Sequence, residues 1–137
     1  MSFQFPIKIY YPDTDAMGLV YHAHYLKFFD QARTEVFHGL GISFEVLKQA
    51  DSGFVVAHID THYKKPAQLE HTYTLLTHLV RCNKAAILFE QKLCQGDEIY
   101  CTALVKVAYV NLITMKPIVM PDSLRQQLKK VESHCAK

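Results

Sequence analysis

The sequence predicts an α+β domain in which one long helix packs against about five, mostly antiparallel strands. One range, 21–37, carries apolar residues at helical spacing, and the ranges before and after it show strand patterns. The chain has 137 residues, half of them apolar and a fifth charged, which is enough for one core and too short to divide convincingly in two. We therefore predict a single domain over residues 1–137, whose sheet buries one face on the helix.

The N-terminal half supplies the first strand and the helices. Residues 3–11 suit a strand, and Pro6 within them indicates an edge or an irregular start. The helical stripe of 21–37 consists of Tyr21, Tyr25, Phe28, Phe29, Ala32 and Val36. Gly39 and Gly41 are expected to end this helix, and a shorter helix is expected over 43–50.

The C-terminal half is read as strands. Alternating residues over 57–63 predict a half-exposed strand, and 72–80 and 85–94 predict two more strands joined by a short turn. The range 99–110 is almost wholly apolar, so we expect a central strand covered on both faces, which indicates that subunits associate. A weak amphipathic stripe beyond Pro121 predicts a terminal helix.

Composition excludes several classes of function. A net charge of +2 without a basic run longer than Lys64-Lys65 argues against nucleic-acid binding, and no apolar stretch is long enough for membrane insertion. His58 and His62 have a zinc-like spacing, but four residues of a strand span about 13 Å, so we expect no metal. The cysteines show no paired pattern and favour a reducing cytoplasm. They are Cys82, Cys94, Cys101 and Cys135.

The candidate reactive residues lie in the segment YYPDTDAMGLVYHAHYLKFFDQARTE. This segment places a carboxylate in a turn, a glycine three residues later and a helix start about seven residues later. The first turn of a helix presents unpaired N–H groups that can hold a developing oxyanion, and Gly18 lets the loop approach a ligand closely. A carboxylate facing the same carbonyl can attack it or deprotonate a water. Both Asp13 and Asp15 fit this role on spacing alone.

The pattern DTDxxGxVYHxxYLxFFxxARTE resembles the 4-hydroxybenzoyl-CoA thioesterase family, most closely its bacterial Tol-Pal-associated branch, the YbgC-type acyl-CoA thioesterases. The likeness runs from Tyr10 through Glu35 and extends weakly to 53–56, Tyr63, Pro66-Ala67 and 99–110. The resemblance implies the hot-dog fold, a curved antiparallel sheet wrapped round a long helix, with active sites at a dimer interface. It also implies a homotetramer built as a dimer of dimers.

Carried onto this chain, the resemblance makes Asp15 the catalytic carboxylate and the backbone N–H of His22 the oxyanion donor, and only the resemblance decides between Asp15 and Asp13. The implied reaction is hydrolysis of an acyl-CoA thioester to a free acid and CoA. No metal or bound cofactor is expected, because CoA is part of the substrate. A thiol with a pKa near ~8.5 leaves readily, so a carboxylate and an oxyanion hole suffice. An acyl carrier protein is an alternative carrier of the acyl group.

Four further residues are expected to contact the substrate. Tyr21 and Tyr25 lie near the helix start and can line an acyl channel, while Lys64 and Lys84 can meet the phosphates of CoA. Cys82 is a rival nucleophile, although nothing in the sequence ties a histidine to it. Two rival functions remain: a 3-hydroxyacyl-thioester dehydratase, and a non-catalytic acyl-carrier or envelope-associated binding module.

Overall fold

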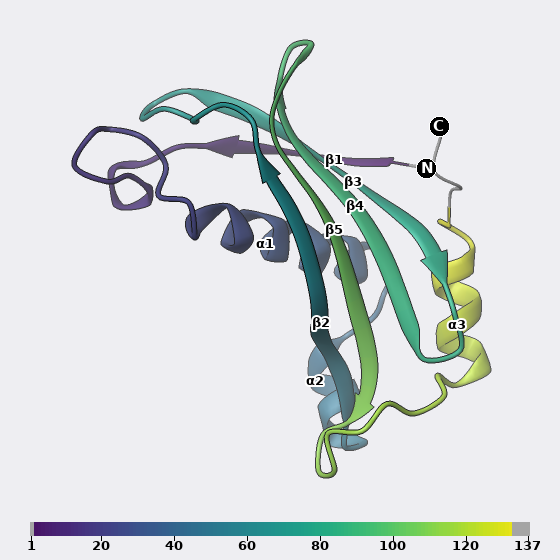
Figure 1. Ribbon diagram of the computed structural model, residues 1–137. Helices are drawn as coiled ribbons and strands as arrows, with labels where there is room; N and C mark the ends of the chain where they lie inside the picture. The colour runs from purple at the N-terminus through teal and green to yellow at the C-terminus, as the bar shows by residue number, and fades with distance from the viewer. Residues whose placement is uncertain (1, 133–137) are drawn as a thin grey trace.

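The computed structural model describes residues 2–132, in which a five-stranded antiparallel sheet curves around one long helix (Figure 1). The strand order is β1-β3-β4-β5-β2. The strands are β1 (Ser2–Lys8), β2 (Ser52–Tyr63), β3 (Thr72–Cys82), β4 (Ala86–Gln95) and β5 (Glu98–Asn111). The helices are α1 (His24–Gly39), α2 (Phe44–Gln49) and α3 (Asp122–Lys129), with a 3-10 turn η1 (Tyr11–Asp13). This confirms the α+β class and the hot-dog arrangement.

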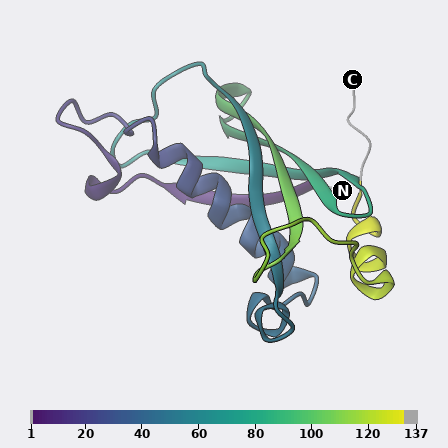
Figure 2. The ribbon, with the colours of Figure 1, turned by 60° about the horizontal axis from the view of Figure 1, so that its bottom comes forward.

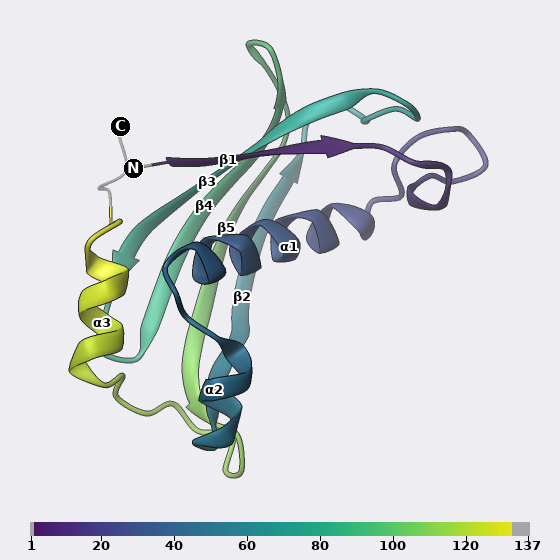
Figure 3. The ribbon, with the colours of Figure 1, turned by 180° about the vertical axis from the view of Figure 1, so that it is seen from behind.

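The long helix α1 lies across the concave face of the sheet, as the view from behind shows (Figure 3). Its buried side chains are Tyr25, Phe28, Phe29, Ala32, Arg33, Val36 and Phe37. Tyr21 was expected in this stripe, but it is 49% exposed and lies before the helix. The helix begins at His24 because the N–H of Tyr21 donates to Asp13 O, at 3.1 Å, and Tyr21 O accepts the His24 N–H at 2.8 Å.

A buried polar network fixes α1 to the sheet. Arg33 Nη1 donates to Gln91 Oε1 of β4 at 2.9 Å, and Gln91 Nε2 donates to Phe29 O at 2.9 Å and to Thr77 Oγ1 at 3.1 Å. Arg33 also pairs with Asp30 at 3.1 Å. Burial lowers the pKa of Arg33, while the carboxylate of Asp30 acts in the opposite direction. A helical stripe does not show this network, because Gln91 reaches α1 only through the curvature of the sheet.

Both edge strands form where the sequence predicted strands, but β1 ends earlier and β2 begins earlier than expected. β1 pairs with β3 alone and contains Pro6, which confirms an edge strand. It ends at Lys8 rather than at residue 11, because Ile9 exchanges backbone hydrogen bonds with the segment Glu70-His71 before the turn η1. β2 forms the other edge, begins earlier than expected and carries an irregularity between Val56 and His58. Figure 2 shows β2 and β5 crossing α1.

The central strand β5 is only partly covered. Its residues that face α1 are buried, but Leu104 is 41% exposed and Lys106 is exposed on the convex face. Cover on both faces was expected, and the single chain provides it only toward the C-terminal end of β5. No helix within residues 2–132 is long and apolar enough to cross a membrane.

Candidate active site

Asp15 lies in a tight loop, residues 14–20, that folds back on itself and is called the Asp15 loop below. The N–H of Asp15 donates to Leu19 O at 2.8 Å, and Thr14 and Val20 form an antiparallel bridge. Its Oδ1 accepts the N–H of Met17 at 2.8 Å and that of Leu19 at 3.3 Å. This side chain caps the turn through one oxygen, while Oδ2 accepts no hydrogen bond from the described residues. The carboxylate is exposed.

The Asp15 loop is anchored to the segment that precedes β3. The N–H of Val20 donates to Ala67 O at 2.9 Å, and the N–H of Leu69 donates to Gly18 O at 3.2 Å. The loop projects beyond the sheet at the N-terminal end of α1 (left in Figure 1). Gly18 adopts φ +76, a left-handed conformation that favours glycine. The carboxylate is therefore exposed on a loop that is hydrogen-bonded at both ends.

The backbone just before α1 offers unpaired donors. His22 and Ala23 lie in a turn between Tyr21 and His24. Within residues 2–132, neither of their N–H groups has an acceptor. The helix begins two residues after His22, so this amide belongs to the preceding turn rather than to the first helical turn. The positive end of the α1 dipole still lies beside it.

Asp13 is occupied by other partners. Its Oδ2 accepts the Tyr10 N–H at 2.9 Å, and its Oδ1 lies 3.1 Å from His24 Nε2. The carboxylate is only 15% exposed. The two aspartates of the motif are thus in different surroundings, a distinction that their spacing in the sequence does not show.

A cavity of about 240 Å³ adjoins His22. It is lined by Val20, His22, Tyr25, Tyr63, Lys64, Lys65 and Pro66. Tyr25 OH accepts the Ala67 N–H at 2.9 Å, and its ring lies 5.4 Å from that of Tyr63. Burial raises the pKa of both phenols, so both are neutral at neutral pH and suited to donate hydrogen bonds rather than to act as bases.

The expected substrate-binding residues separate in space. Tyr25 and Lys64 line the cavity beside His22, whereas Tyr21 is absent from its lining, although its ring lies 4.4 Å from that of His22. Lys84 follows the far end of the 11-residue strand β3, which spans roughly 35 Å at ~3.3 Å per residue, whereas the Asp15 loop is anchored before its start. Tyr63 and Lys65 also line the cavity, although they were not among the four residues expected to contact the substrate. The weak likeness around Tyr63 was the sequence signal for Tyr63, and Lys65 belongs to the short basic run with Lys64.

The two lysines of the cavity differ in charge balance. Lys65 Nζ pairs with Glu98, while no carboxylate of residues 2–132 lies within ion-pair distance of Lys64. The ammonium group of Lys64 is therefore the one with uncompensated charge at the cavity. An incoming anion would meet Lys64 without displacing a carboxylate.

The thiols and the His58 and His62 pair lie away from this site. Cys82 is 3% exposed at the distant end of β3, and burial raises the pKa of its thiol, which is unfavourable for a nucleophile. Cys94 and Cys101 are also buried and free, and Cys135 lies outside the described residues. In residues 2–132, no three His, Cys, Asp or Glu side chains come together as metal ligands.

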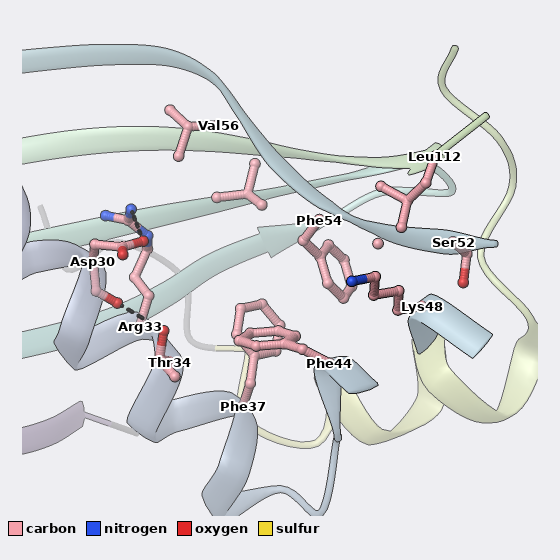
Figure 4. A pocket seen from close by; sticks show the side chains of 12 residues that line it. Asp30, Arg33, Thr34, Phe37, Phe44, Lys48, Ser52, Phe54, Val56 and Leu112 are labelled. Carbon is pink, nitrogen blue, oxygen red and sulfur yellow. Dashed lines mark hydrogen bonds and ion pairs between the residues drawn. The ribbon is translucent and has the colours of Figure 1, made fainter. Parts of the chain in front are cut away.

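A second cavity, of about 390 Å³, lies between α1, α2 and the start of β2 (Figure 4). Phe37 stacks on Phe54 at 4.8 Å and meets Phe44 at 5.2 Å, which gives it an aromatic wall. Arg33, paired with Asp30, forms its charged end. This cavity can hold an apolar group, but no residue of the Asp15 loop lines it.

Comparison with known proteins shows the family to which this chain belongs. The family model of the thioesterase-like superfamily matches residues 11–128. The chain belongs to this superfamily. The thioesterase is 40% identical over 125 residues to acyl-CoA thioesterase YbgC of Haemophilus influenzae, covering 90% of this chain and 92% of the relative. It is 32% identical over 129 residues to acyl-CoA thioester hydrolase YbgC of Escherichia coli O6:H1, covering 93% and 96%.

Solved structures of other thioesterases have the same fold as this chain. A probable thioesterase from Bartonella henselae matches the thioesterase with a TM-score of 0.82 and 32% identity, over 88% of this chain and 100% of that one. DHNA-CoA thioesterase from Staphylococcus aureus matches with a TM-score of 0.87 over 95% and 90%; at 21% identity this match supports the fold alone. These matches confirm the YbgC-type resemblance and the hot-dog fold.

The left-handed conformation of Gly18 can be tested by substitution with alanine. A Cβ at Gly18 or at Gly39 would meet nothing within 4 Å, so the two sites differ in backbone conformation and not in space. Gly18→Ala should lower the free energy of unfolding by about 1–2 kcal/mol, because alanine is strained at positive φ. Gly39→Ala, at the end of α1, should be neutral or stabilising by up to about 1 kcal/mol. Urea denaturation measures both, and equal effects would contradict the left-handed turn.

Proposed function

We propose that this thioesterase hydrolyses acyl-CoA thioesters, with Asp15 as the catalytic carboxylate and the backbone N–H of His22 as an oxyanion donor. The observation that carries the proposal is the pairing of one exposed carboxylate that keeps a free oxygen with an amide that lacks an acceptor. Both belong to one short segment before α1. The names of the YbgC relatives supply the substrate class.

The carboxylate of Asp15 suits attack or base catalysis for a structural reason. The hydrogen bonds from Met17 and Leu19 both reach Oδ1, and they hold the side chain in one orientation. Oδ2 is left for the substrate carbonyl or for a water. Asp13 lacks this freedom, since Tyr10 and His24 occupy its two oxygens.

The unpaired amide suits the other half of the reaction. Attack on a thioester carbonyl places negative charge on its oxygen, and a fixed N–H stabilises that charge without reorganising. The dipole of the 16-residue helix α1 adds positive potential at the same end. The leaving thiolate of CoA needs no strong general acid.

The CoA end of the substrate carries phosphates, which a positive charge beside the cavity can bind. Lys64 borders the cavity beside His22 with its charge uncompensated, so we propose that it meets a phosphate of CoA. Lys84 was expected in the same role, but its place at the far end of β3 gives this proposal no support within one chain. Tyr25 and Tyr63 form the aromatic wall along which the pantetheine arm or the start of the acyl group runs.

Two rival functions are less well supported. A dehydratase relies on a histidine paired with a carboxylate at the substrate. His22 lines the cavity, but no carboxylate of residues 2–132 lies within ion-pair distance of it, and His24 Nε2 faces Asp13, which is absent from the cavity lining. A non-catalytic binding module needs no free carboxylate oxygen beside an unpaired amide. Release of free thiol from a panel of acyl-CoA substrates separates the three, because only a hydrolase produces it.

Asp15→Asn is expected to lower kcat by several orders of magnitude and to leave folding and oligomeric state intact. Asparagine keeps the size and the turn hydrogen bonds of the aspartate, but it is neither a nucleophile nor a base, so the loss falls on the chemical step. Thiol release under substrate saturation measures it. The matched control is Asp13→Asn, whose amide oxygen still accepts the N–H of Tyr10; near-normal turnover of Asp15→Asn, or loss in the control alone, would refute the assignment.

Lys64→Ala is expected to raise KM for acyl-CoA about threefold to tenfold at low salt, and less at high salt, because an exposed phosphate contact is screened. Lys84→Ala serves as the comparison and should leave KM unchanged. Steady-state kinetics at two ionic strengths test both variants. An unchanged KM in Lys64→Ala at low salt would remove this lysine from the site.

We also propose that the thioesterase is a homodimer that pairs further into a tetramer. Among the described residues, no strand covers the outer edge of the 12-residue strand β2, and an open edge of this length favours pairing with another chain. Val56 on β2 and Leu104 on β5 add exposed apolar surface, at 45% and 41%. Light scattering at micromolar concentration should give a multiple of the chain mass; a stable, active monomer would contradict the proposal.

A further inference from the structure

Asp13 holds together three segments around the candidate site. Its Oδ2 accepts the Tyr10 N–H, at 2.9 Å, and thereby closes the turn η1. Its backbone oxygen accepts the Tyr21 N–H, at 3.1 Å, from the returning arm of the Asp15 loop. Its Oδ1 lies 3.1 Å from Nε2 of His24, the first residue of α1. One residue thus ties the turn, the returning arm and the helix.

The two reactive groups lie inside this set of contacts. Asp15 follows Asp13 by two residues, and the amide of His22 precedes His24 by two. The carboxylate and the amide are joined covalently only through a loop of six residues that contains Gly18. The contact between Asp13 and His24 gives a shorter connection between the two groups, because it joins a residue two positions before the carboxylate to a residue two positions after the amide.

We propose that Asp13 and His24 are a positioning pair, which holds the free oxygen of Asp15 and the N–H of His22 at the separation that attack on the thioester carbonyl requires. This inference rests on the proposed roles of Asp15 and His22. Neither side chain of the pair contacts the substrate. Reaction rates depend steeply on such separations, and a displacement of about 1 Å can cost a factor of about 100.

The surroundings of the pair suit a fixed contact. Its side chains are 25% exposed for His24 and 15% for Asp13, so solvent screens the contact only in part. The ring of His24 also packs edge-on against Phe28, at 5.8 Å, which restricts its rotation. The chain contains a matched exposed pair, His62 and Asp60, at 3.3 Å with 69% and 57% exposure, which joins two residues of a single strand.

The test measures kcat and KM of alanine and conservative variants. Asp13→Ala and His24→Ala should each lower kcat about tenfold with KM within a factor of two, and the double variant should lose no more than either single variant, because both remove one contact. Asp13→Asn keeps an oxygen for the Tyr10 N–H and can donate its side-chain N–H to the Nε2 lone pair of His24, and His24→Gln can donate its side-chain N–H to Oδ1 of Asp13. Both variants should restore kcat to within about threefold of the parent. His62→Ala and Asp60→Ala should leave kcat unchanged.

Three outcomes would overturn the positioning pair. These are a fall of kcat that matches the loss of folded protein by circular dichroism, an effect on KM alone, and losses that multiply in the double variant. If Asp13→Ala does not fold, His24→Ala decides, since it removes the contact to α1 and leaves the Asp13–Tyr10 hydrogen bond in place. The Asp15→Asn variant tests the proposed role of Asp15 independently of the positioning pair. If Asp15→Asn abolishes turnover and the variants of Asp13 and His24 do not lower kcat, the positioning pair fails and the proposed function stands.

Discussion

The packing of α1 on the concave face of the sheet is the interaction on which the rest of the structure depends. Fully burying one large apolar side chain stabilises a fold by about 1.5–3 kcal/mol, and this helix contributes Phe28, Phe29 and Phe37 at 5% exposure or less. The helix also fixes the direction of the chain that precedes it. Because α1 cannot slide on the sheet, the turn before His24 and the Asp15 loop are held at one end of it, where solvent and substrate can reach them.

The network around Arg33 and Gln91 makes that packing specific. An apolar helix face tolerates small shifts, whereas a buried guanidinium and a fully buried amide satisfy each other in one register only. Gln91 comes from β4 and also bonds to Phe29 O of the helix and to Thr77 of β3. The network therefore links the helix to two neighbouring strands, and it fixes where along the sheet the first turn of α1 begins.

The candidate site is made mainly from backbone. Hydrogen bonds between main-chain groups anchor the Asp15 loop to the segment 66–69, and the proposed oxyanion donor is itself a backbone amide. Side chains act on this frame at few points, where Asp15 is proposed to provide the reactive oxygen and Asp13 ties the segments together. The proposed donor and the loop anchors are main-chain groups, so the side chains at those positions do not form these contacts.

The sequence by itself predicted most elements of the fold and proposed where the candidate site lies. Helical spacing identified the core of α1, alternation identified β2, and turn residues with a glycine identified the Asp15 loop, since these signals reside in neighbouring residues. Only the tertiary structure decided three other features: α1 begins at His24 because Asp13 O binds the Tyr21 amide, Gln91 meets Arg33, and Lys64 rather than Lys84 lies beside His22. Each of these features depends on a contact between residues that are separated in the chain. The register and curvature of the sheet set which of these residues meet.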